Sequence, residues 1–168
     1  MLLLHPPFAP AENAGYIGAY IPGVRENGGQ YTHAVPWLVQ ALAHIGAYDT
    51  AWEIARALLP LFHTDTPQGL HTYKTEPYVL CGDVYAGENP GRGGWSWYTG
   101  SALWYFRVVT RELLGLTAGQ GGEVKRDGIP LDVETLSAIR LLTRLDIGPV
   151  KVADADASTV TTRTTSAS

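Results

Sequence analysis

The sequence predicts an all-α fold in which helical hairpins are joined by long loops. Apolar side chains recur at helical spacing in three segments, near residues 31–45, 50–60 and 99–114. No segment before residue 117 shows the alternating apolar and polar pattern of a half-buried strand. The chain has 168 residues, of which 45% are hydrophobic and 17% charged, which is typical of a soluble globular protein.

The first helix follows a long irregular segment. Prolines and glycines recur through residues 1–30, and a helix cannot run through them. Helical spacing begins near Tyr31 and continues through Trp37 to Ile45. Pro36 fits the first turn, and Gly46 is placed to end the helix.

A second helix is expected to form a hairpin with the first. It carries Trp52, Ala55 and Leu58 on one face and ends near Pro60. Asp49 or Thr50 is the expected N-cap, since both side chains can accept a hydrogen bond from a free backbone N–H group.

The next segments are expected to alternate between loop and helix. Residues 62–75 are rich in Thr, Pro and Gly and predict a loop, whereas 77–86 predict a short helix that begins with a proline. Residues 87–94 predict another loop, and 99–114 the third strong helix. The buried side of this helix is expected to carry Leu103, Phe106, Val109 or Thr110, and Leu113.

The character of the sequence changes after residue 116. We expect three parts: a helical domain at 1–116, an extension at 117–152 with one helix near 132–145, and a disordered tail at 153–168. The tail consists mostly of Ala, Ser, Thr and Asp and has no apolar periodicity.

Composition excludes several functional classes. The net charge of −4 and the lack of a basic run argue against binding to nucleic acid or to an anionic membrane. No segment approaches the roughly 20 apolar residues of a membrane helix. The single cysteine, Cys81, fits a reducing compartment, so we expect a cytoplasmic chain. The five histidines lack metal-ligand spacing, so no metal is expected. The sequence has neither the P-loop of nucleotide-binding proteins nor a dinucleotide-binding glycine motif, so no cofactor is expected.

The first chemically dense segment is a polar glycine loop at 22–33. Arg25, Glu26 and Asn27 supply donors and acceptors suited to sugar hydroxyls. His33 lies in the first helical turn, where an imidazolium would meet an anion. The alternative is an ordinary capped helix start in which His33 bonds to the loop.

The second dense segment, at 95–102, opens the third helix. Thr99 is a natural N-cap, and Gly100 and Ser101 would present free N–H groups at the positive end of the helix dipole. The aromatic triplet Trp95, Trp97 and Tyr98 is expected to form the wall of a sugar subsite. The alternative is a plain Thr cap whose aromatic neighbours belong to the core.

Glu76 and Asp83 are a candidate pair of glycosidase carboxylates. Seven residues apart, they would share a helix face only if the helix began at or before Glu76, which Pro77 disfavours. Asp83 is therefore expected to be a carboxylate at the surface or at the start of a helix.

Three motifs in order resemble glycoside hydrolase family 94. They are Gly-Val-Arg-Glu-Asn-Gly-Gly-Gln-Tyr-Thr-His at 23–33, Glu-Pro-Tyr-Val at 76–79 and Gly-Gly-Trp-Ser-Trp-Tyr-Thr-Gly-Ser-Ala at 93–102. This family holds cellobiose and chitobiose phosphorylases and the phosphorylase-like domain of cyclic β-1,2-glucan synthases. The resemblance implies an (α/α)6 barrel, of which this chain holds the last helices.

The resemblance also implies roles for single residues. It places phosphate at His33, Thr99 and Gly100, and turns Arg25 toward a sugar. The substrate would be a β-linked glucan or a glucose disaccharide. The further substrate-binding residues expected are Glu26, Asn27, Glu76, Tyr78, Trp97 and Tyr98.

The implied reaction is inverting phosphorolysis with inorganic phosphate as co-substrate. One carboxylic acid protonates the leaving oxygen while a phosphate oxygen attacks C1 from the opposite face. In the family this acid belongs to a Trp-Asn-Asp type segment upstream of the glycine loop, and the sequence has no such segment. We therefore expect no catalysis by this chain alone, and an upstream portion or partner chain that completes the barrel. A parent protein of the glucan synthase type would be anchored in the inner membrane.

Three functional hypotheses follow. The first is a fragment of a phosphorylase or glucan-synthase catalytic domain. The second is a non-catalytic carbohydrate-binding protein derived from the same fold, and the third is a helical-barrel hydrolase or epimerase with coincidental motifs. A binding protein should hold glucan or phosphate saturably, whereas a broken fragment should expose apolar helix faces and aggregate.

Overall fold

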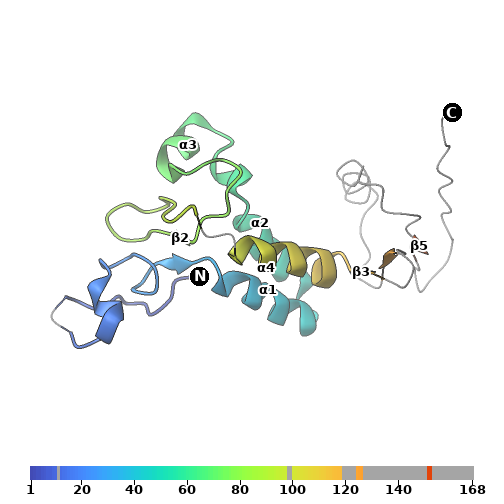
Figure 1. Cartoon of the computed structure of the whole chain (residues 1–168), viewed down its shortest axis with the longest axis horizontal. Helices are drawn as coiled ribbons and strands as arrows, with labels where there is room; N and C mark the ends of the chain where they lie inside the picture. Colours follow the sequence, from blue (N-terminus) through green and yellow to red (C-terminus); the bar gives the residue numbers. More distant parts are fainter. Residues whose placement is uncertain (11, 98–99, 119–123, 127–150, 153–168) are drawn as a thin grey trace. The chain divides into compact units, whose positions relative to one another are not determined.

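The computed structural model describes residues 1–10, 12–97, 100–118, 124–126 and 151–152. The chain divides into two compact units, Met1–Val108 and Val109–Ser168, each of which is treated by itself (Figure 1). The helix predicted at 132–145 and the disordered tail predicted at 153–168 lie outside the described residues.

Helices make up most of the regular structure of the first unit, as the sequence predicts. They are α1 (Ala34–His44), α2 (Tyr48–Ala57), α3 (Pro67–Tyr73) and α4 (Gly100–Val108), with the 3-10 turns η1 (Gly15–Ala19) and η2 (Pro60–His63). Two short strands, β1 (Gln30–Tyr31) and β2 (Asp83–Val84), were not expected from the sequence.

The helices α1 and α2 form the predicted hairpin, and Gly46 ends α1 as expected. Its φ of +79° lies in the left-handed region that favours glycine. The N–H groups of Gly46 and Ala47 donate to the carbonyls of Ala43 (3.0 Å) and Leu42 (2.9 Å), which satisfies two carbonyls at the helix end. The predicted cap of α2 is wrong, because α2 begins at Tyr48 and Asp49 lies within its first turn.

The loop predicted at 62–75 is wrong, because this segment contains α3. Thr66 caps the helix, its hydroxyl accepting the N–H of Gly69 at 3.0 Å. Pro67 occupies the first helical turn, where its missing N–H costs nothing. A capping threonine before a proline therefore outweighs the loop-like composition.

The helix predicted at 77–86 is also wrong. The segment runs through a turn into β2, which pairs antiparallel with β1 in the register Gln30 to Val84 and Tyr31 to Asp83. The N–H of Thr32 extends the contact by donating to the carbonyl of Gly82 at 2.9 Å. Pro77 favours the start of a helix, but pairing with β1, which is distant in the sequence, makes this segment extended instead.

The core of the first unit lies where α2 and the segment before β2 meet α1 and α4. Val35, Leu58 and Leu80 are buried there, and Ile54, Ala102 and Tyr105 pack against them. The hydroxyl of Tyr105 donates to the carbonyl of Ala55 at 3.0 Å, tying α4 to α2.

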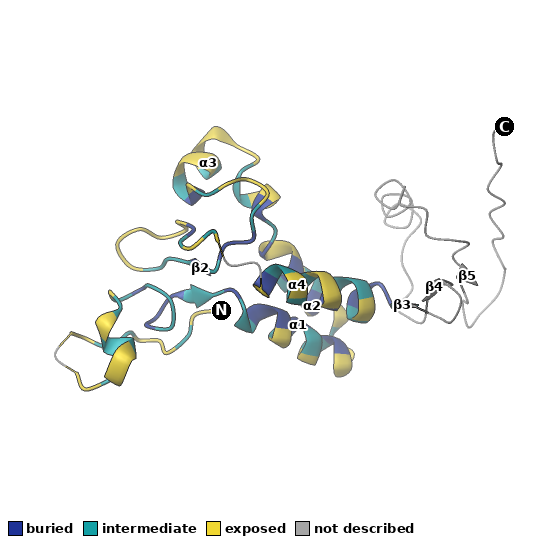
Figure 2. Cartoon of the chain, viewed as in Figure 1, coloured by how far each residue is buried: buried dark blue, intermediate teal, exposed yellow. Residues whose placement is uncertain are grey.

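The buried face predicted for α4 is wrong, because the helix turns a different side toward the core. Leu103 and Phe106 are 70% and 66% exposed, and the residues of α4 that pack against the core are instead Ala102 and Tyr105, three residues apart. Figure 2 shows that α4 carries both exposed and buried residues along its length. Tyr105 takes the inward position because its ring fills the space beside Leu58 while its hydroxyl reaches a carbonyl of α2. The expected burial of Leu113 is confirmed.

The second unit contains a π-helical turn and short strands. The elements are η3 (Val109–Leu113), β3 (Leu116–Ala118), β4 (Val124–Arg126) and β5 (Lys151–Val152). The strand β4 lies in the middle, antiparallel to β3 and parallel to β5. These strands were not expected from the sequence of the extension.

The described residues contain neither a membrane-spanning helix nor a cluster of metal ligands. No helix in the ranges given above is long and apolar enough to cross a membrane. In the same ranges, no three His, Cys, Asp or Glu side chains gather closely enough to hold a metal ion.

The substitution Leu103→Ala tests which side of α4 faces the core, and Leu58→Ala, at the end of α2, is its buried reference. Leu58→Ala should destabilise the protein by about 2–5 kcal/mol, because a side chain 8% exposed leaves a cavity. The matched Leu103→Ala should change the free energy of unfolding by less than about 0.5 kcal/mol. Urea denaturation of both variants measures the difference, and an equal loss in the two would contradict the observed orientation of α4.

Candidate functional site

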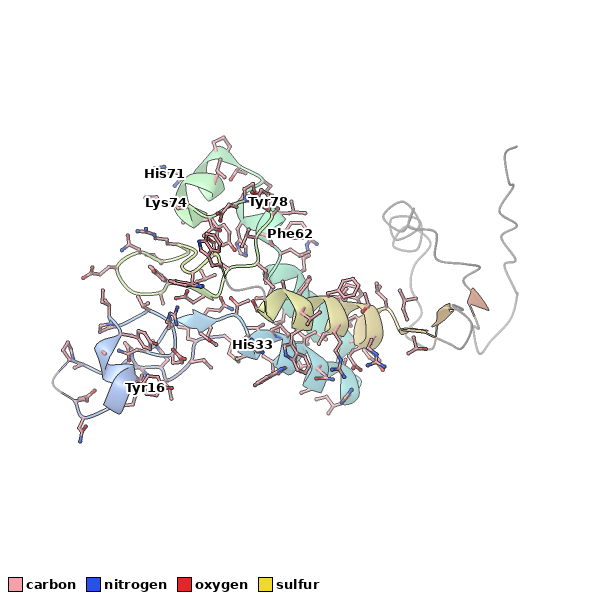
Figure 3. The ribbon with its side chains drawn as sticks, viewed as in Figure 1. Tyr16, His33, Phe62, His71, Lys74 and Tyr78 are labelled. Atoms are coloured by element: carbon pink, nitrogen blue, oxygen red, sulfur yellow. The ribbon has the colours of Figure 1, made fainter. Side chains whose placement is uncertain are left out.

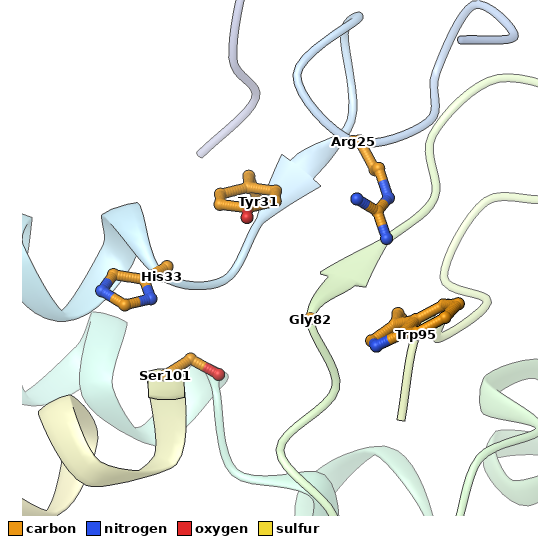
Figure 4. A pocket seen from close by; sticks show the side chains of 6 residues that line it. All are labelled: Arg25, Tyr31, His33, Gly82, Trp95 and Ser101. Atoms are coloured by element: carbon orange, nitrogen blue, oxygen red, sulfur yellow. The ribbon is translucent and has the colours of Figure 1, made fainter. Parts of the chain in front are cut away.

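A small pocket lies where the loop before β1, the start of α1, the edge of β2 and the start of α4 come together (Figure 4). It has a volume of about 60 Å³, room for roughly four or five waters, so it suits a small ion or one end of a sugar. The residues that line it are Arg25, Tyr31, His33, Gly82, Trp95 and Ser101.

Arg25 supplies the fixed positive charge of the pocket. Its φ of +50° is uncommon for a residue with a side chain and costs about 1–2 kcal/mol, so the surrounding contacts must hold it. The guanidinium carbon lies 5.6 Å from the ring centre of Tyr20 and 5.7 Å from that of Trp95, within cation–π range. Burial lowers the pKa of Arg25, but the hydrogen bond with Tyr20 and the charge of Asp83 outweigh it and raise the pKa overall.

Asp83 lies behind the pocket and is 2% exposed. Its Oδ2 accepts the backbone N–H of Arg25 at 3.3 Å, and its Oδ1 accepts that of Trp95 at 3.1 Å. The expectation of a carboxylate at the surface or at a helix start is therefore wrong, and so is a helical pair with Glu76, which is exposed in a turn.

The opposite side of the pocket is the start of α4. Gly100 lies beside the His33 ring, since a Cβ added at Gly100 would stand 3.7 Å from His33 Cε1. The first N–H groups of a nine-residue helix have no partner within it and carry the positive end of its dipole. Ser101 is 3% exposed, and its Oγ is buried without a hydrogen-bond partner among the described residues.

His33 has an aromatic setting. It occupies the N-cap position of α1, and its ring meets those of Trp37 and Trp104 edge-on, at centroid distances of 5.2 and 6.3 Å. This packing fixes the plane of the imidazole next to Gly100. His33, Gly100 and Arg25, predicted from separate motifs, thus lie around one small region.

Other predicted residues of the glycine loop lie away from the pocket lining. Asn27 is completely buried: its amide donates to the carbonyls of Tyr20 (2.9 Å) and Phe8 (3.2 Å) and accepts the N–H of Phe8 at 2.7 Å. In place of the expected sugar contact, Asn27 holds the loop that carries Arg25. Glu26 is half-buried, and its Oε2 has no hydrogen-bond partner in the described part of the chain.

The remaining predicted residues are exposed or not described. Tyr78 is 79% exposed and lies beside α3, away from His33 (Figure 3). Trp97 is 86% exposed, and Glu76 is exposed as well. Tyr98 and Thr99 lie outside the described residues.

Comparison with known proteins agrees with the motifs. Residues 1–115 match the family described as the glycosyl hydrolase 94 superfamily, catalytic domain. The chain belongs to this superfamily. The resemblance inferred from the three motifs is confirmed.

The relatives of this glycosyl hydrolase 94 chain include proteins named as a glucan synthase and as phosphorylases. It is 48% identical over 106 residues to the cyclic beta-(1,2)-glucan synthase NdvB of Rhizobium meliloti (strain 1021), covering 62% of this chain and 4% of that protein. It is 30% identical over 144 residues to solabiose phosphorylase of Paenibacillus borealis, covering 83% and 18%. It is 31% identical over 117 residues to N,N'-diacetylchitobiose phosphorylase of Vibrio furnissii, covering 68% and 14%. The chain therefore spans less than a fifth of the length of each of these relatives.

Sequence reasoning missed part of the candidate site. Tyr31 and Gly82 line the pocket, yet neither was named as a site residue, and Asp83 was named only as a candidate catalytic carboxylate, although it supports the pocket from behind. Of the two tryptophans expected to form the sugar wall, Trp95 lines the pocket and Trp97 is exposed. No local signal distinguished Asp83 from a surface carboxylate.

A buried polar pair supports the strand that carries Asp83. The hydroxyl of Tyr73 and the Sγ of Cys81 lie 3.1 Å apart, and Sγ donates to the carbonyl of Asp83 at 3.1 Å. Burial, with a smaller effect of the nearby Asp83 carboxylate, raises the pKa of the Cys81 thiol. Burial also raises the pKa of Tyr73.

These shifts predict weaker folding at alkaline pH. In the unfolded chain a cysteine loses its proton near pH 8.5, whereas folded Cys81 keeps it, so the stabilisation is complete below that pH. The free energy of unfolding should fall as pH rises from 8 to 10, by at most about 1.4 kcal/mol per pH unit for each proton. Cys81→Ala should flatten the fall between pH 8 and 9.5 in urea denaturation. An unchanged slope would contradict the assignment.

Proposed function

We propose that this chain forms the phosphate and sugar subsites of a glycoside phosphorylase-type domain acting on β-linked glucans. Its helices would be the last helices of an (α/α)6 barrel. The observation that carries the proposal is the Ser101 hydroxyl, which is buried at the N-terminus of α4 without a hydrogen-bond partner among the described residues and lines the same pocket as His33. Membership of the glycosyl hydrolase 94 superfamily supports the class of reaction.

The anion subsite follows from the groups at the start of α4. The Ser101 hydroxyl, the free N–H groups of α4 and the His33 ring all supply donors, and Arg25 adds a positive charge across the pocket. No carboxylate is among the described residues that line this pocket. A desolvated hydroxyl beside a helix N-terminus is costly unless it has a partner, and a phosphate oxygen would provide one. Thr99 is proposed to add the capping hydroxyl.

The sugar subsite follows from Arg25 and Trp95. Trp95 is 48% exposed and is proposed to contact a pyranose ring, and the guanidinium of Arg25 supplies hydrogen-bond donors next to it. Trp97 presents a second exposed ring in the same segment. Trp97, Tyr98, Glu76, Tyr78 and Glu26 are kept as candidates for contacts with a longer glucan.

The proposed chemistry is inverting phosphorolysis. A phosphate oxygen attacks C1 of the sugar, the glycosidic C1–O bond breaks, and a carboxylic acid gives its proton to the leaving oxygen. The pocket groups would hold the phosphate in line and place it beside the sugar, which supplies much of the rate. The acid is proposed to come from outside this pocket.

Inorganic phosphate should bind at the start of α4. In a 15N-labelled chain at pH 7, titration with phosphate should shift the amide signals of Gly100 and Ser101 saturably. Ser101→Ala should weaken binding by about tenfold or more, because it removes a hydrogen bond to a charged group. The control is Ser96→Ala, whose hydroxyl does not line the pocket.

Two outcomes would contradict this subsite. Signals that do not saturate, or that move equally throughout the chain, would show non-specific ion binding. Equal affinity of the wild type and Ser101→Ala would show that the buried hydroxyl does not contact the anion.

The second candidate is a carbohydrate-binding protein without catalysis, which the lack of a carboxylate among the described lining residues favours. It predicts that the purified chain, given phosphate and either cellobiose or β-1,2-linked glucose oligosaccharides, releases no glucose 1-phosphate, although it binds both ligands. A coupled enzymatic assay for glucose 1-phosphate measures this, with a complete cellobiose phosphorylase as the positive control. Phosphate-dependent release above the no-protein blank would overturn the second candidate and show that this chain carries its own acid.

A further inference from the structure

The β1–β2 contact places a single buried carboxylate behind both halves of the proposed sugar subsite. Asp83 faces Tyr31 across the ladder, and its two oxygens accept N–H groups from different loops. One belongs to Arg25, which precedes β1, and the other to Trp95, which follows β2. Asp83 also accepts the N–H of Gly94 at its own carbonyl, at 2.8 Å. One residue therefore joins the two loops that present the guanidinium and the indole.

The two loops need this support. Arg25 has a positive φ that its backbone does not prefer, so its amide position depends on contacts such as the bond to Asp83. The indole of Trp95 is half-exposed, and its packing against the guanidinium depends on where its backbone is held. The negative charge of Asp83 also stabilises the charged form of Arg25.

The chain makes room for this carboxylate with a glycine. A Cβ at Gly94 would overlap the Oδ1 of Asp83 and come within 2.8 Å of the Tyr85 ring. Only glycine lets the loop approach closely enough for the Trp95 N–H to reach the carboxylate.

We propose that Asp83 is a positioning residue that holds Arg25 and Trp95 together as one sugar-recognition unit. This inference rests on the sugar subsite proposed above. Asp83 does not touch the sugar; it acts through two backbone amides. Of the groups proposed for the anion, Ser101 and His33 lie on other elements, and Arg25 acts across the pocket through its charge, which a shift of its loop does not remove. The loss of Asp83 should therefore lower sugar affinity far more than phosphate affinity.

The first variant is Asp83→Asn. An amide can accept only one of the two N–H groups and turns its own donor toward the other, so one loop is released. Affinity for a β-1,2-linked glucose disaccharide should fall by about tenfold, the loss of one such bond. Phosphate affinity should stay equal or rise, because a negative charge has been removed from behind an anion pocket. General unfolding would weaken both affinities. A loss of disaccharide affinity with an unchanged or higher phosphate affinity therefore identifies positioning.

The second variant is Gly94→Ala, which displaces the carboxylate without removing its charge. It should reproduce the loss of disaccharide affinity and leave phosphate affinity within about twofold, since neither α4 nor the net charge changes. The matched control is Glu88→Gln, an exposed carboxylate in the loop after β2. It should change neither affinity. Calorimetric titration of each full-length variant with the disaccharide and with inorganic phosphate gives the dissociation constants.

Hydrogen exchange of the wild type tests the same contacts without a variant. The amides of Arg25 and Trp95 should exchange far more slowly than that of Glu88, although all three lie in loops, because only the first two donate to Asp83. This measurement decides the matter if the variants do not fold. Rapid exchange at Arg25 and Trp95 would overturn the proposal.

The outcomes separate this inference from the proposed function. If the wild type binds both ligands and Asp83→Asn keeps its disaccharide affinity, the positioning role is wrong and the proposed subsites stand. If the wild type binds neither ligand, the proposed function is wrong, and with it the role of Asp83 in sugar recognition. If Asp83→Asn loses both affinities while remaining folded, Asp83 supports the whole pocket and the separation proposed here is wrong.

Discussion

The antiparallel contact between β1 and β2 brings together the loop that carries Arg25, the strand edge at Tyr31 and Gly82, and the loop that carries Trp95, all of which line the pocket. Each strand is only two residues long, so backbone pairing alone gives little stability. The side chain of Asp83 strengthens the contact, because it adds hydrogen bonds to the loop before β1 and to the loop after β2. The buried Tyr73 and Cys81 hold the same strand from behind. The geometry of Arg25 and Trp95 depends on this junction.

The pocket separates positive and negative groups by depth. Hydrogen-bond donors and the Arg25 guanidinium line the surface, with His33 and the start of α4, while the buried carboxylate of Asp83 stands behind them. Because Asp83 is bonded to amides, its charge is satisfied locally and helps to keep Arg25 charged. The arrangement leaves the surface suited to an anion next to a neutral sugar, which is what phosphorolysis requires of its binding groups.

Local sequence signals predicted the helical parts well where they acted within a few residues. The hairpin of α1 and α2, with Gly46 at its turn, follows from apolar spacing and a glycine in the left-handed region. The same approach missed α3, although Thr66 and Pro67 carried a readable cap signal. It also placed Leu103 and Phe106 on the buried side of α4, where they do not lie. A helix with apolar residues on several sides does not specify which side meets the core.

The sequence by itself determined the family, through three motifs in order, and it named His33, Arg25 and Gly100 as residues of interest. Only the tertiary structure decided that Trp95 lines the pocket, that Asn27 is buried inside its loop, and that Asp83 joins two loops. The physical reason is the distance along the sequence over which each kind of interaction acts. Caps, turns and helical periodicity act between near neighbours, and the sequence shows them directly. The partners of Asp83 and Asn27 come from distant segments, and only the folded chain brings them within hydrogen-bond distance.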